Sequence, residues 1–304
     1  MIDKRQGLTL AILLSLVAAA CVAPPTRVPT GKLKVVATFS VLGDLVQNVG
    51  GDKIELHTLV APGVDTHTFE PSPADNRTLA EASLVFENGL GFETWLDDLY
   101  TSSGSKAERV AVSDGIEPLK VEGNDRSEFD PHVWHTAANA IQMTRNIRDA
   151  LAKADPANAS AYQANAETYL AQLQELDSWI LNEVKSLPEA RRKLVTTHDT
   201  FGYFADRYGF EIIGTVLPSS TEGASPSAQE VAALVETVKA AGVPVVFAEN
   251  VSSNTLLRQI ADEAGITAVA SLYTDALGPT GSDGDTYLKM MRYNVTTIVS
   301  ELNK

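Results

Sequence analysis

The sequence lacks several features that would otherwise dominate its chemistry. It has one cysteine in 304 residues, so no intramolecular disulfide can form. Basic residues are scarce, 24 Lys and Arg against 39 Asp and Glu, and a net charge of −15 disfavours nucleic acid as a partner. The longest apolar run, residues 8–20, is shorter than the ~20 residues of a membrane-spanning helix. What remains is a globular chain with the length of one large domain or two lobes.

Motifs of the common hydrolases and nucleotide-binding enzymes are also absent. The sequence contains no HExxH, no GxSxG and no Walker-type phosphate loop. We therefore expect no catalytic residue and no enzyme activity. A metal-dependent hydrolase with scattered catalytic residues stays open as an alternative, because such a site needs no contiguous motif.

The N-terminus has the pattern of a lipoprotein export signal. Lys4 and Arg5 precede the apolar residues 8–20, and three alanines lead directly into Cys21. We predict that residues 1–20 are a lipoprotein signal peptide and that Cys21 is the lipid anchor. An ordinary signal peptide beside a chance cysteine is the alternative. Residues 21–32, rich in Pro and Thr, are predicted to be a tether, which makes the mature protein extracytoplasmic and lipid-anchored to the cell membrane, in a periplasm or at the cell surface.

The rest of the chain alternates short apolar runs with helical spacing in both halves, which indicates an α/β fold with parallel sheets. We predict an N-terminal lobe over residues 33–155 and a C-terminal lobe over residues 188–304. The predicted strands are Lys34–Phe39, Ile54–Val60, Ser83–Phe86 and Arg109–Val112 in the first lobe, and Lys193–Thr197, Glu211–Val216, Val243–Ala248 and Thr267–Ser271 in the second. Four strands in each half indicate two similar lobes.

Residues 156–187 are predicted to be a linking helix. The segment Ala157–Ser186 contains no Gly and no Pro and is rich in strong helix formers. Pro156 fits the first turn and Pro188 lies just past the end. At 1.5 Å per residue the helix would be roughly 45 Å long. We expect it to pack on both lobes and to resist hinge opening, with a coiled-coil partner as the alternative.

Three histidines and one aspartate are the candidate ligands. Of the five histidines, His67 and His198 follow predicted strands, and His132 lies at the entry to a helix that begins near Thr136. Asp275 follows the last predicted strand. Ligands of parallel sheets gather beyond the carboxyl ends of the strands, so a binding site is expected there. Taken singly, each of these residues would be assigned to the surface or to a helix cap.

Together the four would form a complete shell for a divalent metal, with two ligands from each lobe. Four protein ligands leave no fixed position for a substrate water, which favours binding over catalysis. Glu249, Glu70 and Asp199 are candidates for the carboxylates that orient the ligand rings, on position alone. His57, inside a predicted strand, is expected to be structural.

Six blocks of sequence carry a family resemblance. They are PGVDTHTFEPSP at 62–73, VFENGLGFETWL at 85–96, DPHVWHTAANA at 130–140, THDTFGYFADRYG at 197–209, FAENVSSNTLLRQIADEAG at 247–265 and YTDALG at 273–278. From Lys34 to Lys304 the chain resembles the cluster A-I solute-binding proteins, the metal-binding components of zinc and manganese ABC importers. The resemblance implies two lobes, each with a four-stranded parallel sheet flanked by helices, joined by one long rigid helix. It implies metal ligands at His67, His132, His198 and Asp275, and delivery to a membrane permease by what we expect to be a monomer.

The chain departs from that family in two places. His135 stands where an aliphatic residue is usual, and it follows His132 by three, so both rings could face one way on a helical turn. His135 could support the ligands from outside the ligand set or act as an extra transient ligand, but we favour a ring that simply lies outside the metal shell. Many zinc-specific members carry a long His-rich loop before the second ligand, whereas residues 121–130 are short and contain no His.

The donor set favours Zn²⁺, with Mn²⁺ next. Imidazole suits a borderline cation, while Mn²⁺ prefers harder oxygen donors, and manganese-type members often have Glu at the position of His198. The predicted activity is capture and release of the metal by a lipoprotein of an ABC importer. A surface adhesin with a structural metal is the further alternative.

Overall fold

The computed structural model describes residues 31–121, 129–218, 226–251 and 253–304. The predicted signal peptide, Cys21 and nearly all of the predicted tether lie outside the described residues. In the described part, no helix combines the length and the apolar character needed to cross a membrane.

The first sheet lies in the N-terminal half. It has four parallel strands in the order β2-β1-β3-β4, namely β1 (Leu33–Phe39), β2 (Ile54–Val60), β3 (Leu84–Glu87) and β4 (Glu108–Ala111). Its helices are α1 (Ser40–Gly50), α2 (Pro73–Glu81), α3 (Leu96–Ser103) and α4 (Ala137–Ala154). The central strand β1 is buried over its last five residues, as expected for a parallel strand covered on both faces.

The second sheet repeats this strand order with β6-β5-β7-β8. Its strands are β5 (Lys193–His198), β6 (Glu211–Leu217), β7 (Val245–Glu249) and β8 (Ala268–Leu272), and its helices are α6 (Gly202–Tyr208), α7 (Ala228–Ala241), α8 (Thr255–Ala264) and α9 (Tyr287–Leu302). The predicted fold class, two lobes with one parallel four-stranded sheet each, is confirmed.

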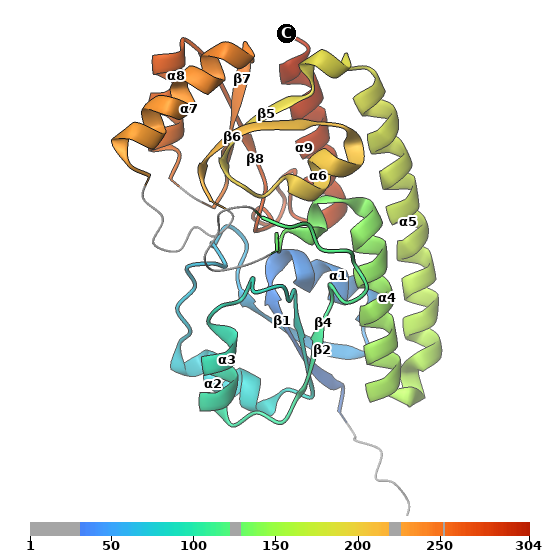
Figure 1. Ribbon diagram of the computed structural model, residues 1–304. Coiled ribbons are helices and arrows are strands. Elements are labelled where there is room, and N and C mark those ends of the chain that lie inside the picture. The colour runs from blue at the N-terminus through green and yellow to red at the C-terminus, as the bar shows by residue number, and fades with distance from the viewer. Residues whose placement is uncertain (1–30, 122–128, 219–225, 252) are drawn as a thin grey trace, which may run out of the picture. The chain divides into compact units, whose positions relative to one another are not determined.

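The long helix α5 (Ala159–Lys185) runs beside both lobes (Figure 1). It packs against α1 and α4 from the first half and α9 from the second. Seven side chains at helical spacing are buried: Tyr162, Ala166, Tyr169, Leu173, Leu176, Ile180 and Val184. Its 27 residues correspond to about 40 Å, so a single helix links the two lobes as predicted.

The lobes share one apolar core. Phe39 of β1, Leu173 of α5 and Tyr287 of α9 belong to the same buried cluster, and residues Lys32–Lys304 form one compact unit. Division of the chain at 33–155, 156–187 and 188–304 therefore remains a proposal about lobes within a single folded body. The two sheets present the loops after β2, β5 and β8 to a common region between the lobes.

Candidate metal centre

The structure brings His67, His132, His198 and Asp275 together. His67 lies in the loop after β2, His132 just before the 3₁₀ turn η1 (Val133–His135), His198 at the end of β5 and Asp275 in the loop after β8. One ligand atom from each lies within 4.8 Å of all the others. His67 is 4% exposed and the other three are 0% exposed, so the cluster is enclosed.

The ligand atoms have the spacing of donors around a small cation. His132 Nε2 is 3.2 Å from His67 Nε2 and 3.4 Å from His198 Nε2. Asp275 Oδ2 is 3.4 Å from His67 Nε2 and 3.2 Å from His198 Nε2, and Asp275 Oδ1 is 3.9 Å from His132 Nε2. Metal–nitrogen and metal–oxygen bonds of about 2.0–2.2 Å place tetrahedral ligands at comparable mutual separations.

Asp130 orients the His132 ring. Its Oδ1 accepts a 2.7 Å bond from His132 Nδ1 and a 2.9 Å bond from the backbone N–H of the same residue. The Nδ1 proton is thereby used, and Nε2 presents a lone pair to the centre of the cluster. A side chain at Gly202 would place its Cβ 2.5 Å from Asp130 Oδ2, so glycine at the start of α6 makes room for this carboxylate.

Glu249 holds His198 in the same way from the end of β7. Its Oε2 is 2.5 Å from His198 Nδ1, and its Oε1 accepts a 2.7 Å bond from the His198 backbone N–H. Thr274 Oγ1 donates a further 3.1 Å bond to Oε2. Two of the three ligand rings are therefore fixed by a buried carboxylate on the side opposite the cluster.

His67 is held by its backbone and by packing. Its N–H donates to Asp65 Oδ1 at 2.9 Å, and its ring meets the Phe92 ring edge-on with centroids 4.8 Å apart. Trp95 Nε1 donates to the carbonyl of the preceding Thr66 at 2.9 Å. This loop is therefore fixed against the N-terminal lobe.

Asp275 has one oxygen that no described group satisfies. Thr200 Oγ1 lies 3.4 Å from Oδ1, whereas buried Oδ2 has no hydrogen-bond donor. When the rings are neutral, the Nδ1 protons of His132 and His198 go to Asp130 and Glu249, so Nε2 lone pairs and a carboxylate face one another. That arrangement is repulsive unless a cation lies between them, and it fits a divalent metal.

Without a metal, a proton is the cation available to the cluster. Burial lowers the pKa of His198, but the carboxylates of Glu249 and Asp275 outweigh it and raise that pKa well above its usual range. Burial opposes ionisation of Asp275, yet the nearby charges of His198 and His132 lower its pKa well below the usual value. A metal that enters the site must displace this proton, so binding releases protons.

The other candidates from the sequence lie apart from this cluster. His135 is fully buried, its ring nitrogens have no described partner, and its ring packs on Phe201 with centroids 4.6 Å apart. Burial lowers the pKa of His135 to about 3, so the ring is neutral. Glu70 is exposed. Burial and the neighbouring Asp130 raise the pKa of the partly buried Asp199, which makes no described hydrogen bond to a ligand ring.

Sequence reasoning overlooked three residues that support the cluster. Asp130 orients His132, Thr200 contacts Asp275, and Asn250 bonds the backbone on both sides of Asp275. Asp130 could have been found, because an acidic residue two places before a ligand His can accept both its N–H and its ring proton. Asn250 carries no such local signal, since its partners are more than twenty residues away.

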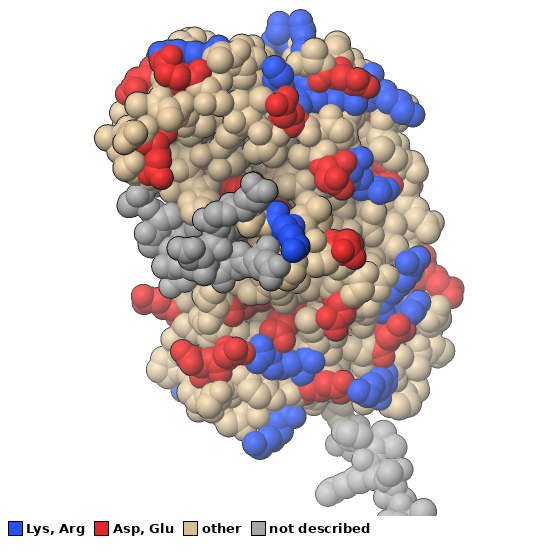
Figure 2. Space-filling model, in the orientation of Figure 1, with Lys and Arg blue, Asp and Glu red and all other residues tan. Residues whose placement is uncertain are grey.

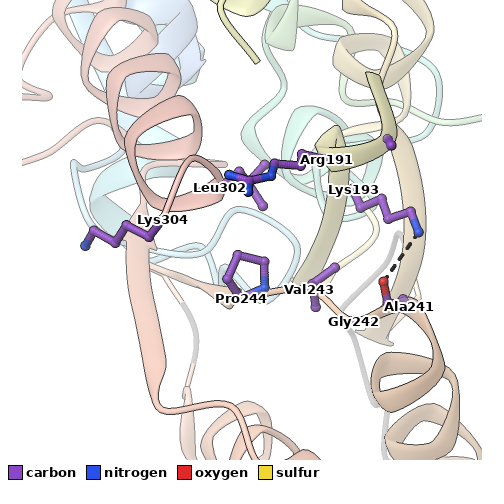
Figure 3. A pocket seen from close by; sticks show the side chains of 9 residues that line it. Arg191, Lys193, Ala241, Gly242, Val243, Pro244, Leu302 and Lys304 are labelled. Atoms are coloured by element: carbon purple, nitrogen blue, oxygen red, sulfur yellow. Dashed lines mark hydrogen bonds between the residues drawn. The ribbon is translucent and has the colours of Figure 1, made fainter. Parts of the chain in front are cut away.

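A separate cavity of about 210 Å³ lies between the start of β5, the turn before β7 and the end of α9 (Figure 3). Arg191, Lys193 and Lys304 contribute to its lining, which contains no histidine and no carboxylate side chain. Lys193 Nζ points to the carbonyl of Ala241 at 3.4 Å. The cavity therefore offers no side chain suited to a metal ion. On the face of the molecule shown in Figure 2, acidic and basic side chains are interspersed.

Comparison with known proteins places the chain among metal-binding transport proteins. Residues 35–301 match the model of the family described as zinc-uptake complex component A, periplasmic. The chain is 35% identical to the manganese-binding lipoprotein MntA of Halalkalibacterium halodurans, over 96% of this chain and 97% of that protein. It is 32% identical to the manganese ABC transporter substrate-binding lipoprotein PsaA of Streptococcus anginosus, over 99% and 100%.

Solved structures agree. The periplasmic zinc binding protein TroA from Treponema pallidum superposes with a TM-score of 0.83 at 31% identity, covering 90% of this chain and 99% of that one. A Mn-bound periplasmic metal binding protein from Candidatus Liberibacter asiaticus superposes with a TM-score of 0.79 at 29% identity, covering 90% and 100%.

Proposed function

The chain belongs to the family of substrate-binding proteins of metal ABC transporters, and from that membership we propose that it captures one divalent transition metal between its lobes and delivers it to a membrane permease. The proposed ligands are His67, His132, His198 and Asp275. The observation that carries the proposal is the unsatisfied Asp275 oxygen facing imidazole nitrogens in an enclosed site.

Members of this family are solute-binding proteins and not enzymes, and the chain is a binding protein. Neither a hydrolase nor a dedicated adhesin is favoured by its relatives. Four protein ligands also leave no coordination position for an attacking water. The metal is cargo, and release requires the permease to separate ligands that the two lobes supply jointly.

We propose Zn²⁺ as the metal bound most tightly and Mn²⁺ as the second candidate. Three imidazoles and one carboxylate suit the borderline Zn²⁺, and affinity for such sites generally ranks Zn²⁺ above Mn²⁺. Relatives named for zinc and for manganese both resemble this chain, and the names MntA and PsaA support Mn²⁺ as transported cargo. Affinity and cargo are therefore separate questions.

The test is elemental analysis of the purified protein, followed by competition between Zn²⁺ and Mn²⁺. We expect about one bound metal per chain and tighter binding of Zn²⁺. A protein that copurifies with no transition metal and binds neither ion would overturn the function. Tighter binding of Mn²⁺ would overturn only the zinc preference.

We also propose that Cys21 is lipidated and anchors the protein outside the cytoplasmic membrane, as the names of its lipoprotein relatives support. The native chain should incorporate labelled fatty acid, and the Cys21→Ser variant should not. Label in this variant would show that the anchor is elsewhere.

A further inference from the structure

We propose that Asn250 is a positioning residue that holds Asp275 in the ligating position, an inference that rests on the proposed function. Asn250 directly follows β7, and its backbone N–H donates to the carbonyl of Leu272 at 3.1 Å. This bond continues the pairing of β7 with β8 by one residue. The side chain of Asn250 therefore extends from a base that the sheet fixes.

The Asn250 amide bonds the backbone on each side of Asp275. Its Oδ1 accepts from the N–H of Thr274 at 3.0 Å, and its Nδ2 donates to the carbonyl of Ala276 at 3.0 Å. A planar amide that satisfies a donor and an acceptor two residues apart restricts the backbone between them. The residue so restricted is the ligand itself.

Asn294 of α9 holds Tyr273, just before this stretch: its Oδ1 accepts from the Tyr273 N–H at 2.9 Å and its Nδ2 donates to the Tyr273 carbonyl at 2.6 Å. Over residues 274–277, the other backbone bonds lead to the N-terminal lobe. Trp134 Nε1 donates to the carbonyl of Thr274 at 3.1 Å. The Leu277 N–H donates to Ser40 Oγ at 3.0 Å, and its carbonyl accepts from Gly63 N–H at 3.0 Å. From the described C-terminal lobe, Asn250 provides both hydrogen bonds to the backbone of residues 274–276. Without its amide, residues 274–276 would keep only the backbone bond to the opposite lobe, while Asn294 would still hold the loop at Tyr273.

Asn250 and its neighbour thus align the two ligands of the C-terminal lobe. Glu249 orients the His198 ring, and Asn250 holds the loop of Asp275, so adjacent residues set the 3.2 Å separation of His198 Nε2 and Asp275 Oδ2. Groups that orient metal ligands typically contribute about 10- to 100-fold to metal affinity. We expect an effect in this range from the Asn250 side chain.

The experiment is a double-mutant cycle for Zn²⁺ affinity with Asn250→Ala and Asp275→Ala, measured by competition with a chelator. If Asn250 acts through Asp275, Asn250→Ala weakens binding by about 10- to 100-fold in the native background and by less than about twofold when Asp275 is already Ala. Equal loss in both backgrounds, or no loss in either, would overturn the inference.

Two further measurements complete the test. The d–d spectrum of Co²⁺-loaded Asn250→Ala should approach that of Asp275→Ala, because both lose the carboxylate, whereas a native spectrum would contradict the positioning role. If Asn250→Ala does not fold, Asn250→Asp keeps the acceptor for Thr274, loses the bond to Ala276 and sets a carboxylate oxygen against that carbonyl, and the same coupling criterion applies. Failure of the unmodified chain to bind Zn²⁺ or Co²⁺ would instead overturn the proposed function.

Discussion

Replacement of His135 by Leu should stabilise the metal-free protein. His135 is 0% exposed, and both of its ring nitrogens lack a partner among the described residues. A buried polar atom without a hydrogen bond costs about 1–3 kcal/mol. Leu has a similar size and no polar atom, but it forfeits ring contacts with Phe201 and Trp134 that are worth about 0.5–1.5 kcal/mol each. The expected net gain is about 1–3 kcal/mol near neutral pH.

The gain should increase as the pH falls. Burial lowers the folded-state pKa of His135 to about 3, well below its usual value of 6.5. Between these two pKa values the unfolded chain binds a proton on His135 that the folded chain does not, so acid lowers the free energy of unfolding of the native protein. Leu binds no proton, so the variant does not lose stability in this way. At about 1.4 kcal/mol per pH unit, the advantage of the variant should grow by about 2 kcal/mol between pH 8 and pH 5.

Urea unfolding of chelator-treated protein at these two pH values, paired with Zn²⁺ titration, checks the reasoning. A variant less stable than the native chain near pH 8 would show that the ring has a bonding partner, and an equal gain at both pH values would show that the folded ring takes up a proton. Metal affinity should change by less than about twofold, since the ring lies outside the four-ligand cluster. A tenfold loss would show that His135 supports the ligands or is one of them.

Three further changes test other parts of the site and fold. His198→Glu should shift selectivity toward Mn²⁺, because a carboxylate is the harder donor; competition titration that finds the Zn²⁺-to-Mn²⁺ ratio unchanged would remove the basis of the zinc argument. Gly202→Ala should weaken Zn²⁺ binding by roughly tenfold, because its Cβ would displace Asp130 from its bond to His132, and retention of full affinity would show that this bond is dispensable. Burial raises the pKa of Glu93 to about 7, so the folded state holds the Glu93 proton more tightly than the unfolded state does. The folded protein therefore loses stability as the pH rises from about 4.5 to 7. Relative to Glu93→Gln, the native chain should therefore lose up to about 3 kcal/mol over that interval, and parallel unfolding curves would contradict it.

Sequence reasoning predicted the fold well where periodicity was strong. The linking helix was predicted over residues 156–187 and is observed over Ala159–Lys185. The strand predicted over Val243–Ala248 begins later, at Val245. Pro244 has no N–H to donate to a neighbouring strand, so the hydrogen-bonded strand starts only after it. Helix α3 was missed, because Leu96–Ser103 is short and polar; the left-handed Gly104 that ends it was its clearest signal.

The site was less accessible from sequence than the fold. Strand ends and family resemblance pointed to the four ligand positions, but the groups that orient them depend on tertiary pairing. Asn250 reaches Thr274 only because β7 and β8 are neighbours in register, and no local pattern encodes that contact. Glu70 was a candidate to orient a ligand ring because it follows His67 by three residues, but it is exposed. Proximity in sequence therefore did not identify the groups that orient the ligands.

The near-complete enclosure of the cluster has a kinetic consequence. Three of the four side chains have no contact with solvent, and only the His67 side retains a trace of it. A bound ion would then exchange with ions in solution only as often as the protein opens the site, even when the competing ion binds more tightly. The cargo would be retained by a slow off-rate as well as by equilibrium, and the transporter would act on the ion chiefly by opening a route.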